Sequence, residues 1–181
     1  MREILLPAGE ELKRLRAGEF VRLTGLLYTA RDRTYRKILE TLRGGGSLPV
    51  DLRGGAVYHC GPIVVRRGGG YEVLSCGPTT SSRLDEMQEE FVRRTGVRIL
   101  VGKGGMDPRV ARRVSGLGCV YLAFTGGAGA LAASFVRGVR GVHWPELGVE
   151  AMWVLEVREF GPLLVVVDAQ GRSLHSRMKG I

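Results

Sequence analysis

A cluster of hydroxyl and guanidinium side chains, Thr79-Thr80-Ser81-Ser82-Arg83, contains residue types that bind anions. It lies between a predicted strand over residues 71–74 and a segment, 83–94, whose apolar residues recur at helical spacing. Ser82 and Asp85 match a capping box at the start of this helix. A helix N-terminus offers unpaired N–H groups, so a carboxylate or phosphate could bind there, helped by the hydroxyls and the arginine. A capped turn beside a solvated arginine explains the cluster, taken alone, equally well.

The same order of strand, turn and helix recurs twice downstream. Residues 97–101 form a predicted strand, followed by a glycine-rich turn with Lys103 and a helix start at Asp107-Pro108. Residues 119–124 form another predicted strand, followed by a second glycine-rich turn and a small-residue helix over 130–136. Such units produce parallel strands, because each helix returns the chain to the same edge. We therefore expect the turns to meet at the carboxyl edge of a sheet, where ligands bind in α/β folds.

The rest of the chain predicts further strands and one more junction between a strand and a helix. A strand over 20–28 leads to a turn with Arg31 and Asp32, then to a helix that ends at the glycines 44–46. A surface arginine beside a capping aspartate remains an alternative to a binding role for Arg31. Residues 48–67 predict short, barrel-like strands broken by glycine and proline. The other predicted elements are a short helix over 8–16, a loop over 141–148 and strands over 151–159 and 162–167.

The composition predicts an α/β domain with a substantial core. The 181 residues are 44% hydrophobic, which suits a single domain over 1–181, with residues 172–181 as a possible peripheral tail. We expect a cytoplasmic protein, since there is no signal-peptide pattern and no apolar run long enough to cross a membrane. The net charge of +9 suggests nucleic acid as a partner, but no nucleic-acid motif accompanies the scattered arginines. A cleft for small dianions accounts for the same charge.

Three cysteines and a histidine are further candidates for chemistry. The cysteines are Cys60, Cys76 and Cys119. No two of them form a C-x-x-C pair, and Cys119 opens an apolar strand, so buried thiols are favoured over cluster ligands or a disulfide. His59 lies in an apolar strand, where a packed core histidine is favoured over a catalytic one. Glu150 and Trp153 could help to close a site, or could equally be solvated and packing residues.

Five motifs spread along the chain resemble one family. They are Thr29-Ala30-Arg31-Asp32, Tyr58-His59-Cys60-Gly61-Pro62, Gly77-Pro78-Thr79-Thr80-Ser81-Ser82-Arg83-Leu84-Asp85, Lys103-Gly104-Gly105-Met106 and Glu150-Ala151-Met152-Trp153. In this order they resemble the β subunit, equivalent to the C-terminal domain of fused forms, of class I fumarate hydratase and the related L-tartrate dehydratase. The resemblance implies a swivelling β/β/α domain, with a parallel βαβ layer and additional short strands.

The resemblance also implies a division of roles between two subunits. A separate α subunit would bind a [4Fe-4S] cluster through three cysteines, while this chain would bind no metal and form the opposite wall of the site. By motif position, Thr79 matches the base that removes a proton from the carbon next to the carboxylate, although its hydroxyl would need activation. Arg83 and Lys103 match residues that bind the carboxylates and stabilise the aci-carboxylate. Arg31 matches a further carboxylate-binding arginine, and Thr80 is expected to contact the substrate.

Two positions depart from the family pattern. Tyr35 stands where histidine is frequent, which bears on the choice of substrate, and Leu84 replaces the usual methionine, a conservative packing change. The expected function is the reversible hydration of fumarate to (S)-malate by a hetero-oligomer with the α subunit, without nucleic acid or membrane as a partner. Dehydration of L(+)-tartrate to oxaloacetate is the alternative, and a non-catalytic basic module that binds polyanions is the alternative from another class.

Overall fold

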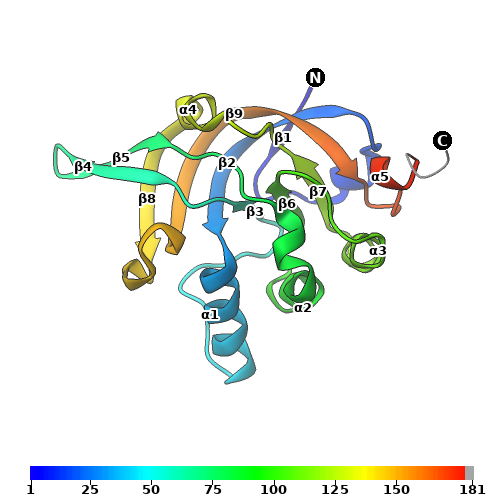
Figure 1. Ribbon diagram of the computed structural model, residues 1–181, viewed down its shortest axis with the longest axis horizontal. Helices are drawn as coiled ribbons and strands as arrows, with labels where there is room; N and C mark the ends of the chain where they lie inside the picture. Colours follow the sequence, from blue (N-terminus) through cyan, green and yellow to red (C-terminus); the bar gives the residue numbers. More distant parts are fainter. Residues whose placement is uncertain (178–181) are drawn as a thin grey trace.

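The computed structural model describes residues 1–177, which form a seven-stranded mixed sheet, a separate hairpin and several helices (Figure 1). The strands are β1 (Arg2–Leu5), β2 (Phe20–Ala30), β3 (Ala56–His59), β4 (Ile63–Arg67), β5 (Gly70–Ser75), β6 (Ile99–Gly102), β7 (Val120–Ala123), β8 (Val136–His143) and β9 (Met152–Val167). The helices are α1 (Asp32–Arg43), α2 (Asp85–Thr95), α3 (Pro108–Gly116), α4 (Gly129–Ser134) and α5 (Leu174–Arg177). Short 3-10 turns are η1 (Glu10–Arg14), η2 (Ser81–Leu84) and η3 (Pro145–Glu150).

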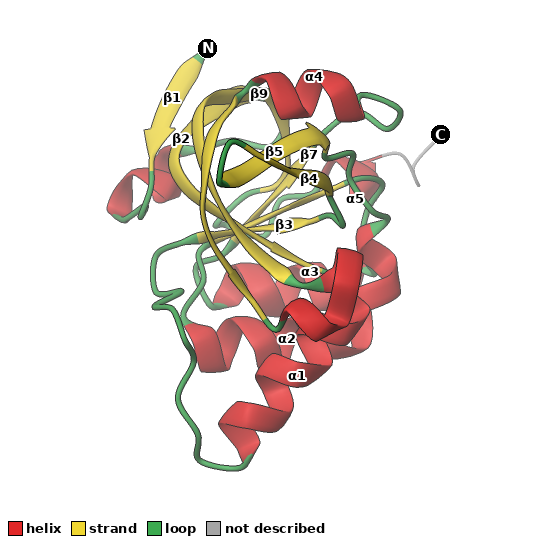
Figure 2. Cartoon of the chain, turned by 90° about the vertical axis from the view of Figure 1, so that its left-hand side faces the viewer, coloured by secondary structure: helices red, strands yellow, loops and turns green. Residues whose placement is uncertain are grey.

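The sheet closes into a barrel, which Figure 2 shows from the side. The strands β1, β2, β3, β6 and β7 are parallel in this order, and β9 runs antiparallel to β7. Most of β9 also pairs with β2, so the ring β2-β3-β6-β7-β9 is closed, and β8 extends it from β9. Figure 1 shows three layers: the long curved strands β2, β8 and β9, then the short parallel strands β3, β6 and β7, and then the helices α1, α2 and α3. The expected α/β class, with a parallel layer and additional strands, is confirmed.

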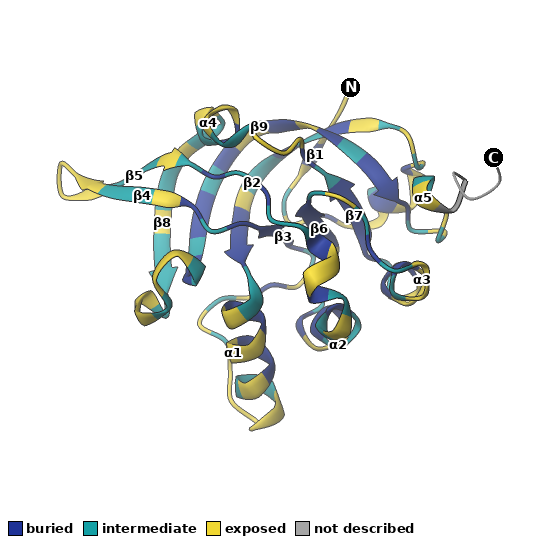
Figure 3. Cartoon of the chain, in the orientation of Figure 1, coloured by how far each residue is buried: buried dark blue, intermediate teal, exposed yellow. Residues whose placement is uncertain are grey.

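Two hydrophobic layers lie on the two faces of the parallel strands. Successive residues of a strand face opposite sides, so Tyr58 of β3 points into the barrel while Val57 packs outside it. Inside, the Tyr58 ring meets Phe160 edge to face, with ring centroids 5.2 Å apart. Outside, Val57 belongs to the same layer as Phe91 of α2. Figure 3 shows the buried residues concentrated along these strands and the inner faces of the helices. Each such side chain contributes roughly 1.5–3 kcal/mol through burial.

The helices α1, α2 and α3 cover the outer face of the parallel strands. α1 buries Tyr35, Ile38 and Leu39 and ends before Gly44, as its apolar spacing predicted. α3 begins as predicted, with the Asp107 carboxylate accepting the N–H of Arg109 at 2.8 Å. The predicted helix over 8–16 is the short 3-10 turn η1. Within residues 1–177, no helix combines the length and the apolar character needed to cross a membrane.

The first predicted unit of strand, turn and helix is wrong as a part of the parallel sheet. Residues 71–74 do lie in a strand, β5, but β5 pairs antiparallel with β4 in a separate hairpin. The hairpin extends away from the barrel (Figure 1), and all of its residues are intermediate or exposed. The parallel strand that precedes α2 is β3, which is buried along its whole length. Burial on both faces distinguishes a central parallel strand from a hairpin strand.

The C-terminal third also differs from the prediction. The small-residue helix α4 ends at Ser134, and residues 136–143, part of which was expected to be a loop, form strand β8. The two strands expected over 151–159 and 162–167 are one strand, β9, which bends near Glu159 (φ 53°) and continues past Gly161. A Cβ atom on Gly161 would lie 2.9 Å from the carbonyl oxygen of Val21, so a glycine permits the close approach of β2. Residues 178–181 lie outside the described residues.

Candidate functional site

The predicted site residues lie at the carboxyl edge of the parallel strands. Arg31 directly follows β2, and Lys103 directly follows β6. Thr79 and Thr80 belong to the segment between the hairpin and η2, and Arg83 lies in η2. The structure therefore brings to one edge residues that are separated by up to 72 positions in the sequence, as parallel strands require.

Backbone hydrogen bonds hold the threonine segment between the ends of β3 and β6. The Thr79 N–H donates to the His59 carbonyl at 2.6 Å, and the Lys103 N–H donates to the Thr79 carbonyl at 3.1 Å. The Ser81 N–H donates to the Lys103 carbonyl at 3.1 Å, and Thr80 forms a parallel bridge with Lys103. The segment thus acts as a short extra strand. Thr79, Thr80 and Lys103 are neighbours because main-chain bonds fix them, so their spacing depends little on flexible side chains.

Lys103 brings an unneutralised cation to this edge. Within residues 1–177, no carboxylate forms an ion pair with its ammonium group, and no hydrogen bond engages the hydroxyls of Thr79 or Thr80. The Lys103 stem passes Gly126 in the turn after β7, where an added Cβ atom would lie 3.5 Å from the lysine Cδ. A lysine whose backbone neighbours are two threonines suits a carboxylate, which accepts hydrogen bonds from both kinds of donor.

Arg31 adds a second cation to this edge, and Gly61 leaves the space that its side chain occupies. A Cβ atom on Gly61 would lie 2.9 Å from the Arg31 Nη1 atom and 3.0 Å from its Cδ atom. The arginine side chain therefore occupies the space beside the end of β3. Its Nε atom is buried and has no hydrogen-bond partner within the described residues. A buried donor without a partner is costly, so a ligand that accepts this N–H would be favoured.

Arg83 connects η2 to the start of α1. One of its terminal nitrogens lies 3.4 Å from the Asp32 carboxylate, and its side chain is 55% exposed. Exposed ion pairs contribute roughly 0.2–1 kcal/mol, so this contact leaves Arg83 able to turn toward a substrate carboxylate. Asp32 is the acidic neighbour that holds the guanidinium near the edge.

The predicted capping box at Ser82 and Asp85 is wrong. Ser82 is exposed within η2, and α2 begins at Asp85 without a side-chain cap. The Asp85 carboxylate instead accepts the N–H of Asp107 at 2.8 Å and the Gln88 side-chain amide at 2.9 Å. Burial raises the pKa of Asp85, and the hydrogen bond from the Asp107 N–H opposes that rise. Asp85 therefore ties α2 to the turn before α3, a long-range contact that local spacing does not reveal.

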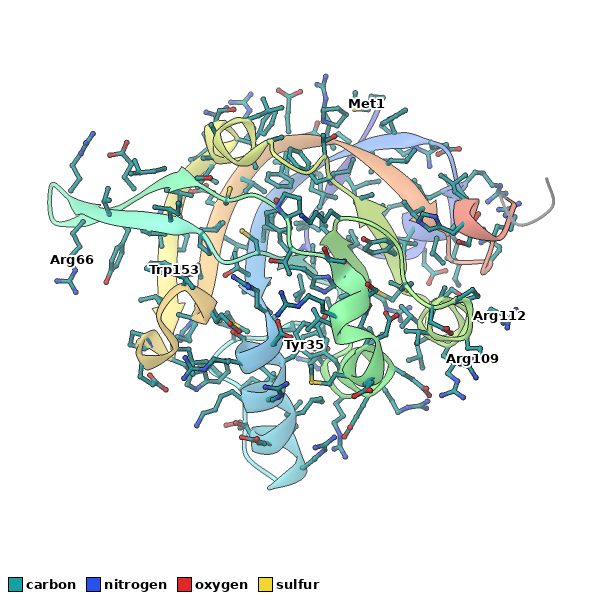
Figure 4. All side chains as sticks on the ribbon, in the orientation of Figure 1. Met1, Tyr35, Arg66, Arg109, Arg112 and Trp153 are labelled. Carbon is teal, nitrogen blue, oxygen red and sulfur yellow. The ribbon has the colours of Figure 1, made fainter. Side chains whose placement is uncertain are left out.

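His59 is a packed core histidine, as predicted. The side chain has no exposed surface, and its ring nitrogens lie 2.7 Å from the Tyr35 hydroxyl and 2.8 Å from the Ser81 hydroxyl. Burial lowers the pKa of His59 to about 3, so the ring is neutral near pH 7. Tyr35 is also buried and stacks on Phe91, with ring centroids 4.0 Å apart. Figure 4 places Tyr35 at the end of α1 next to the barrel, beneath the carboxyl edge.

The three thiols do not converge on a metal site. Cys60 and Cys76 are buried in the layer inside the barrel, whereas Cys119 is buried in the layer under the helices. Burial raises the pKa of all three thiols, that of Cys76 to about 12, which opposes the thiolate form that binds metals. No cluster of three or more metal-binding side chains occurs among residues 1–177. These cysteines therefore do not fit the ligand set of an iron–sulfur cluster.

Glu150 and Trp153 take structural positions near the site. The Glu150 carboxylate accepts the Arg33 N–H at 2.8 Å at the start of α1, and its carbonyl accepts the Thr34 hydroxyl. An acidic group at a helix N-terminus is stabilising. Trp153 lies edge to face with Tyr71, with ring centroids 5.1 Å apart, so it connects β9 to the hairpin. Both residues help to hold the elements that surround the edge.

Comparison with known proteins identifies the family. The sequence profile described as Fumarase C-terminus matches residues 2–178, which is nearly the whole chain. The chain belongs to the Fumarase C-terminus family. The L(+)-tartrate dehydratase subunit beta of Escherichia coli (strain K12) is 42% identical over 171 residues, which cover 94% of this chain and 84% of that protein.

Other similar proteins carry both of the expected activities in their names. A putative L(+)-tartrate dehydratase subunit beta of Methanocaldococcus jannaschii is 42% identical over 93% of this chain and 88% of its own length. A putative fumarate hydratase class I of Geobacillus stearothermophilus is 38% identical over 92% of this chain, but this match covers only 32% of that longer protein. The expected family resemblance is confirmed, and it includes β subunits and a longer single chain.

The family motifs contain the predicted site residues at the carboxyl edge of the strands. Sequence reasoning did not find the buried polar residues that lie beneath this edge. From the sequence, the Ser81 hydroxyl belongs to the predicted anion site, and Tyr121 lies within the predicted strand over 119–124. Both hydroxyls lie beside His59 or the lysine turn. The glycine at the end of the buried strand β6, Gly102, is the sequence feature that points to these residues. A Cβ atom there would overlap the Ser81 hydroxyl, which indicates close packing at that point.

Proposed function

We propose that this chain is the β subunit of a hydro-lyase that adds water to, or removes water from, a four-carbon dicarboxylate. The observation that carries the proposal is the main-chain pairing of Thr79 and Thr80 with Lys103, which makes two hydroxyl-bearing residues the neighbours of a lysine that has no ion-pair partner in residues 1–177. Arg31 and Arg83 flank this group. Three cations around two hydroxyls suit a substrate with two carboxylates.

The residues divide the chemistry as follows. Arg31 and Arg83 bind and orient the carboxylates, and Thr80 donates a hydrogen bond to the substrate. Thr79 accepts the proton from the carbon next to a carboxylate, and the adjacent cation of Lys103 favours the oxyanion form that can accept it. Lys103 also stabilises the negative charge that develops on the aci-carboxylate, where electrostatic stabilisation is most effective. In the hydration direction the same proton returns from Thr79 to carbon.

The iron–sulfur cluster belongs to the partner in this proposal. Since the thiols of this chain lie in two separate layers, a [4Fe-4S] cluster would be held by an α subunit facing the carboxyl edge. When bound there, it would supply Lewis-acid chemistry at the substrate hydroxyl. The assembly is therefore a hetero-oligomer, and we place it in the cytoplasm, without nucleic acid or membrane as a partner.

Fumarate and (S)-malate are the proposed substrate pair, and L(+)-tartrate is the second candidate. The longer relative named as a putative fumarate hydratase supports the first, and the relatives named as tartrate dehydratase subunits support the second. Tyr35 does not discriminate between them by direct contact, because its hydroxyl faces the buried His59 ring and not the open edge. The choice therefore depends on residues that face the substrate, including those of the partner.

Reconstitution tests the proposal. The chain alone is expected to be colourless and inactive, and activity should appear after anaerobic mixing with its α subunit, assayed with malate, fumarate, tartrate and other hydroxy diacids. Turnover of malate or tartrate by the lone chain would contradict the division between two subunits. Inactivity of the cluster-loaded complex toward every hydroxy diacid, combined with salt-sensitive binding of the lone chain to nucleic acid, would favour the non-catalytic alternative.

A further inference from the structure

A line of buried hydroxyl and imidazole groups runs beneath the carboxyl edge. The Tyr35 hydroxyl lies 2.7 Å from the His59 Nε2 atom, and the His59 Nδ1 atom lies 2.8 Å from the Ser81 hydroxyl. The Ser81 hydroxyl also acts on Tyr121, where it opposes the burial that raises the pKa of this tyrosine, and the Tyr121 hydroxyl donates to the Gly104 carbonyl at 3.1 Å. All four side chains are fully buried. The line therefore crosses from α1, through β3 and η2, to β7 and the turn that carries Lys103.

The last acceptor sets the direction of every hydrogen bond in this line. A carbonyl oxygen only accepts, so the Tyr121 hydroxyl donates its proton to Gly104, and its oxygen is left to accept from the Ser81 hydroxyl that lowers its pKa. Ser81 then accepts the N–H of the His59 Nδ1 atom. The Nε2 atom is left as the acceptor for the hydroxyl of Tyr35. One neutral tautomer of His59, with the proton on Nδ1, fits this direction at every contact along the line.

The surroundings of the line favour this neutral arrangement. The His59 ring is fully buried, and among residues 1–177 no carboxylate lies within hydrogen-bond distance of it. The Ser81 carbonyl also accepts the Gln88 side-chain amide at 2.9 Å, which fixes the serine backbone from the other side. Gly102 leaves the space that the Ser81 hydroxyl occupies, since a Cβ atom there would overlap it and would lie 3.0 Å from the His59 Nδ1 atom. Buried polar groups that are fully paired fix one geometry of the elements that carry them.

We propose that the Tyr35–His59–Ser81–Tyr121 line positions the threonine segment and the lysine turn for the reaction. The line reaches the site at two points: Ser81 is two residues after Thr79, and the Gly104 carbonyl, which accepts from Tyr121, is next to Lys103 in the chain. These are positioning residues, because none of them faces the open edge. The inference rests on the proposed function, and it assigns to Tyr35, His59, Ser81 and Tyr121 a role in that reaction beyond their burial.

The tautomer of His59 provides a test that needs no activity. In the full-length chain labelled with 15N at histidine, NMR should show a neutral His59 ring protonated at Nδ1, with a slowly exchanging ring proton and no titration between pH 5 and 8. In Ser81→Ala, the exchange of this proton should become faster. A neutral ring protonated at Nε2, or an imidazolium at pH 7, would overturn the assigned direction of the line.

Kinetics of the reconstituted complex provide the second test. Ser81→Ala is expected to lower kcat about tenfold or more while KM changes less than about threefold, because misplacement affects the transition state more than ground-state binding. Ser115→Ala removes another buried serine hydroxyl, which bonds to the Arg112 carbonyl in α3, so it is the matched control and should stay within about twofold of wild type. Tyr35→Phe should lower kcat in the same way as Ser81→Ala but by a smaller factor. Its control is Tyr28→Phe, which removes a partly buried tyrosine hydroxyl away from the line.

The outcomes separate this inference from the proposed function. If Lys103→Ala abolishes activity while Ser81→Ala and Tyr35→Phe match their controls in kcat, the function stands and the positioning role is overturned. If Lys103→Ala leaves activity unchanged, the proposed function of the edge fails, whereas the NMR result for His59 still decides the hydrogen-bond direction. Melting temperatures of each variant show whether a loss of kcat exceeds that of equally destabilised controls.

Discussion

The two ends of the barrel both carry cations, but they treat these charges differently. At the amino ends of the parallel strands, a cavity of about 670 Å³ is lined by Lys13, Arg53, Arg93 and Arg98 among other residues. Three of these side chains form close ion pairs. The pairs are Lys13 with Glu10 at 2.5 Å, Arg53 with Asp51 at 2.6 Å and Arg93 with Glu89 at 2.6 Å. At the carboxyl edge, the corresponding cations lack such partners or have a distant one.

The proposed site rests on charge balance and not on cavity size. The cavity alone would favour the amino end, where carboxylates already neutralise most of the cations. Hydrogen bonds from Arg53 lower the pKa of Asp51 to about 2, which is the signature of an ion pair complete within the chain. At the carboxyl edge, Arg31 and Lys103 have no carboxylate partner in residues 1–177, and Arg83 has one at 3.4 Å. This uncompensated charge is the reason why we propose an anionic ligand at that edge.

The largest effect is expected from Thr79→Val, which keeps the shape of the side chain and removes its hydroxyl. Without the proposed base, kcat should fall by about 10² or more, while substrate binding stays nearly intact. Exchange of deuterium at the substrate carbon, followed by NMR, should be abolished in the reconstituted complex. Exchange at the wild-type rate would show that Thr79 is a structural residue and that the base lies on the partner subunit.

Removal of one cation from each end sharpens the comparison. Lys103→Ala should lower kcat/KM by roughly 30- to 1000-fold, equivalent to about 2–4 kcal/mol of transition-state stabilisation. Lys13→Ala removes the same charge at the amino end, where Glu10 neutralises it, and should leave kcat/KM within about twofold. Steady-state kinetics of both complexes make the comparison. Equal losses in the two variants would mean that net charge, and not its location, controls activity.

A smaller effect is expected from Arg83→Ala, because this side chain is half exposed and retains a carboxylate neighbour. The expected loss in kcat/KM is about tenfold to 100-fold, and much of it should appear as a higher KM, since Arg83 binds the carboxylate in both ground and transition states. Arg53→Ala is the matched control at the amino end. A KM unchanged by Arg83→Ala would exclude a carboxylate contact by this residue.

The smallest effect concerns stability at the amino end. The folded chain lowers the pKa of Asp51 from 3.8 to about 2, so its ion pair stabilises the fold above pH 3.8 and loses this contribution as the pH falls toward 2. Urea unfolding of Asp51→Asn between pH 2 and 7 should show a slightly lower free energy of unfolding at pH 7 and a smaller decrease in acid. A decrease in acid identical to that of the wild type would contradict the assigned pKa.

Local signals predicted the elements whose neighbours in sequence are also their neighbours in space. Apolar spacing predicted α1 and its end before Gly44, and capping chemistry predicted the start of α3 after Asp107. Residue type predicted the burial of the three thiols. The prediction failed where a partner came from far away. The Asp85 carboxylate bonds to the turn before α3 and not to its own helix start, and β5 pairs with β4 outside the parallel layer.

The amino-acid sequence by itself determined the α/β class and the family and supplied the predicted site residues, because hydrophobic spacing and the motif order are local properties. Only the tertiary structure decided how these residues meet. The closed ring through β9, the insertion of the Thr79 segment between β3 and β6, and the buried line from Tyr35 to Gly104 all depend on hydrogen bonds between distant segments. Such bonds leave little mark on local residue patterns, since almost any backbone can donate and accept them.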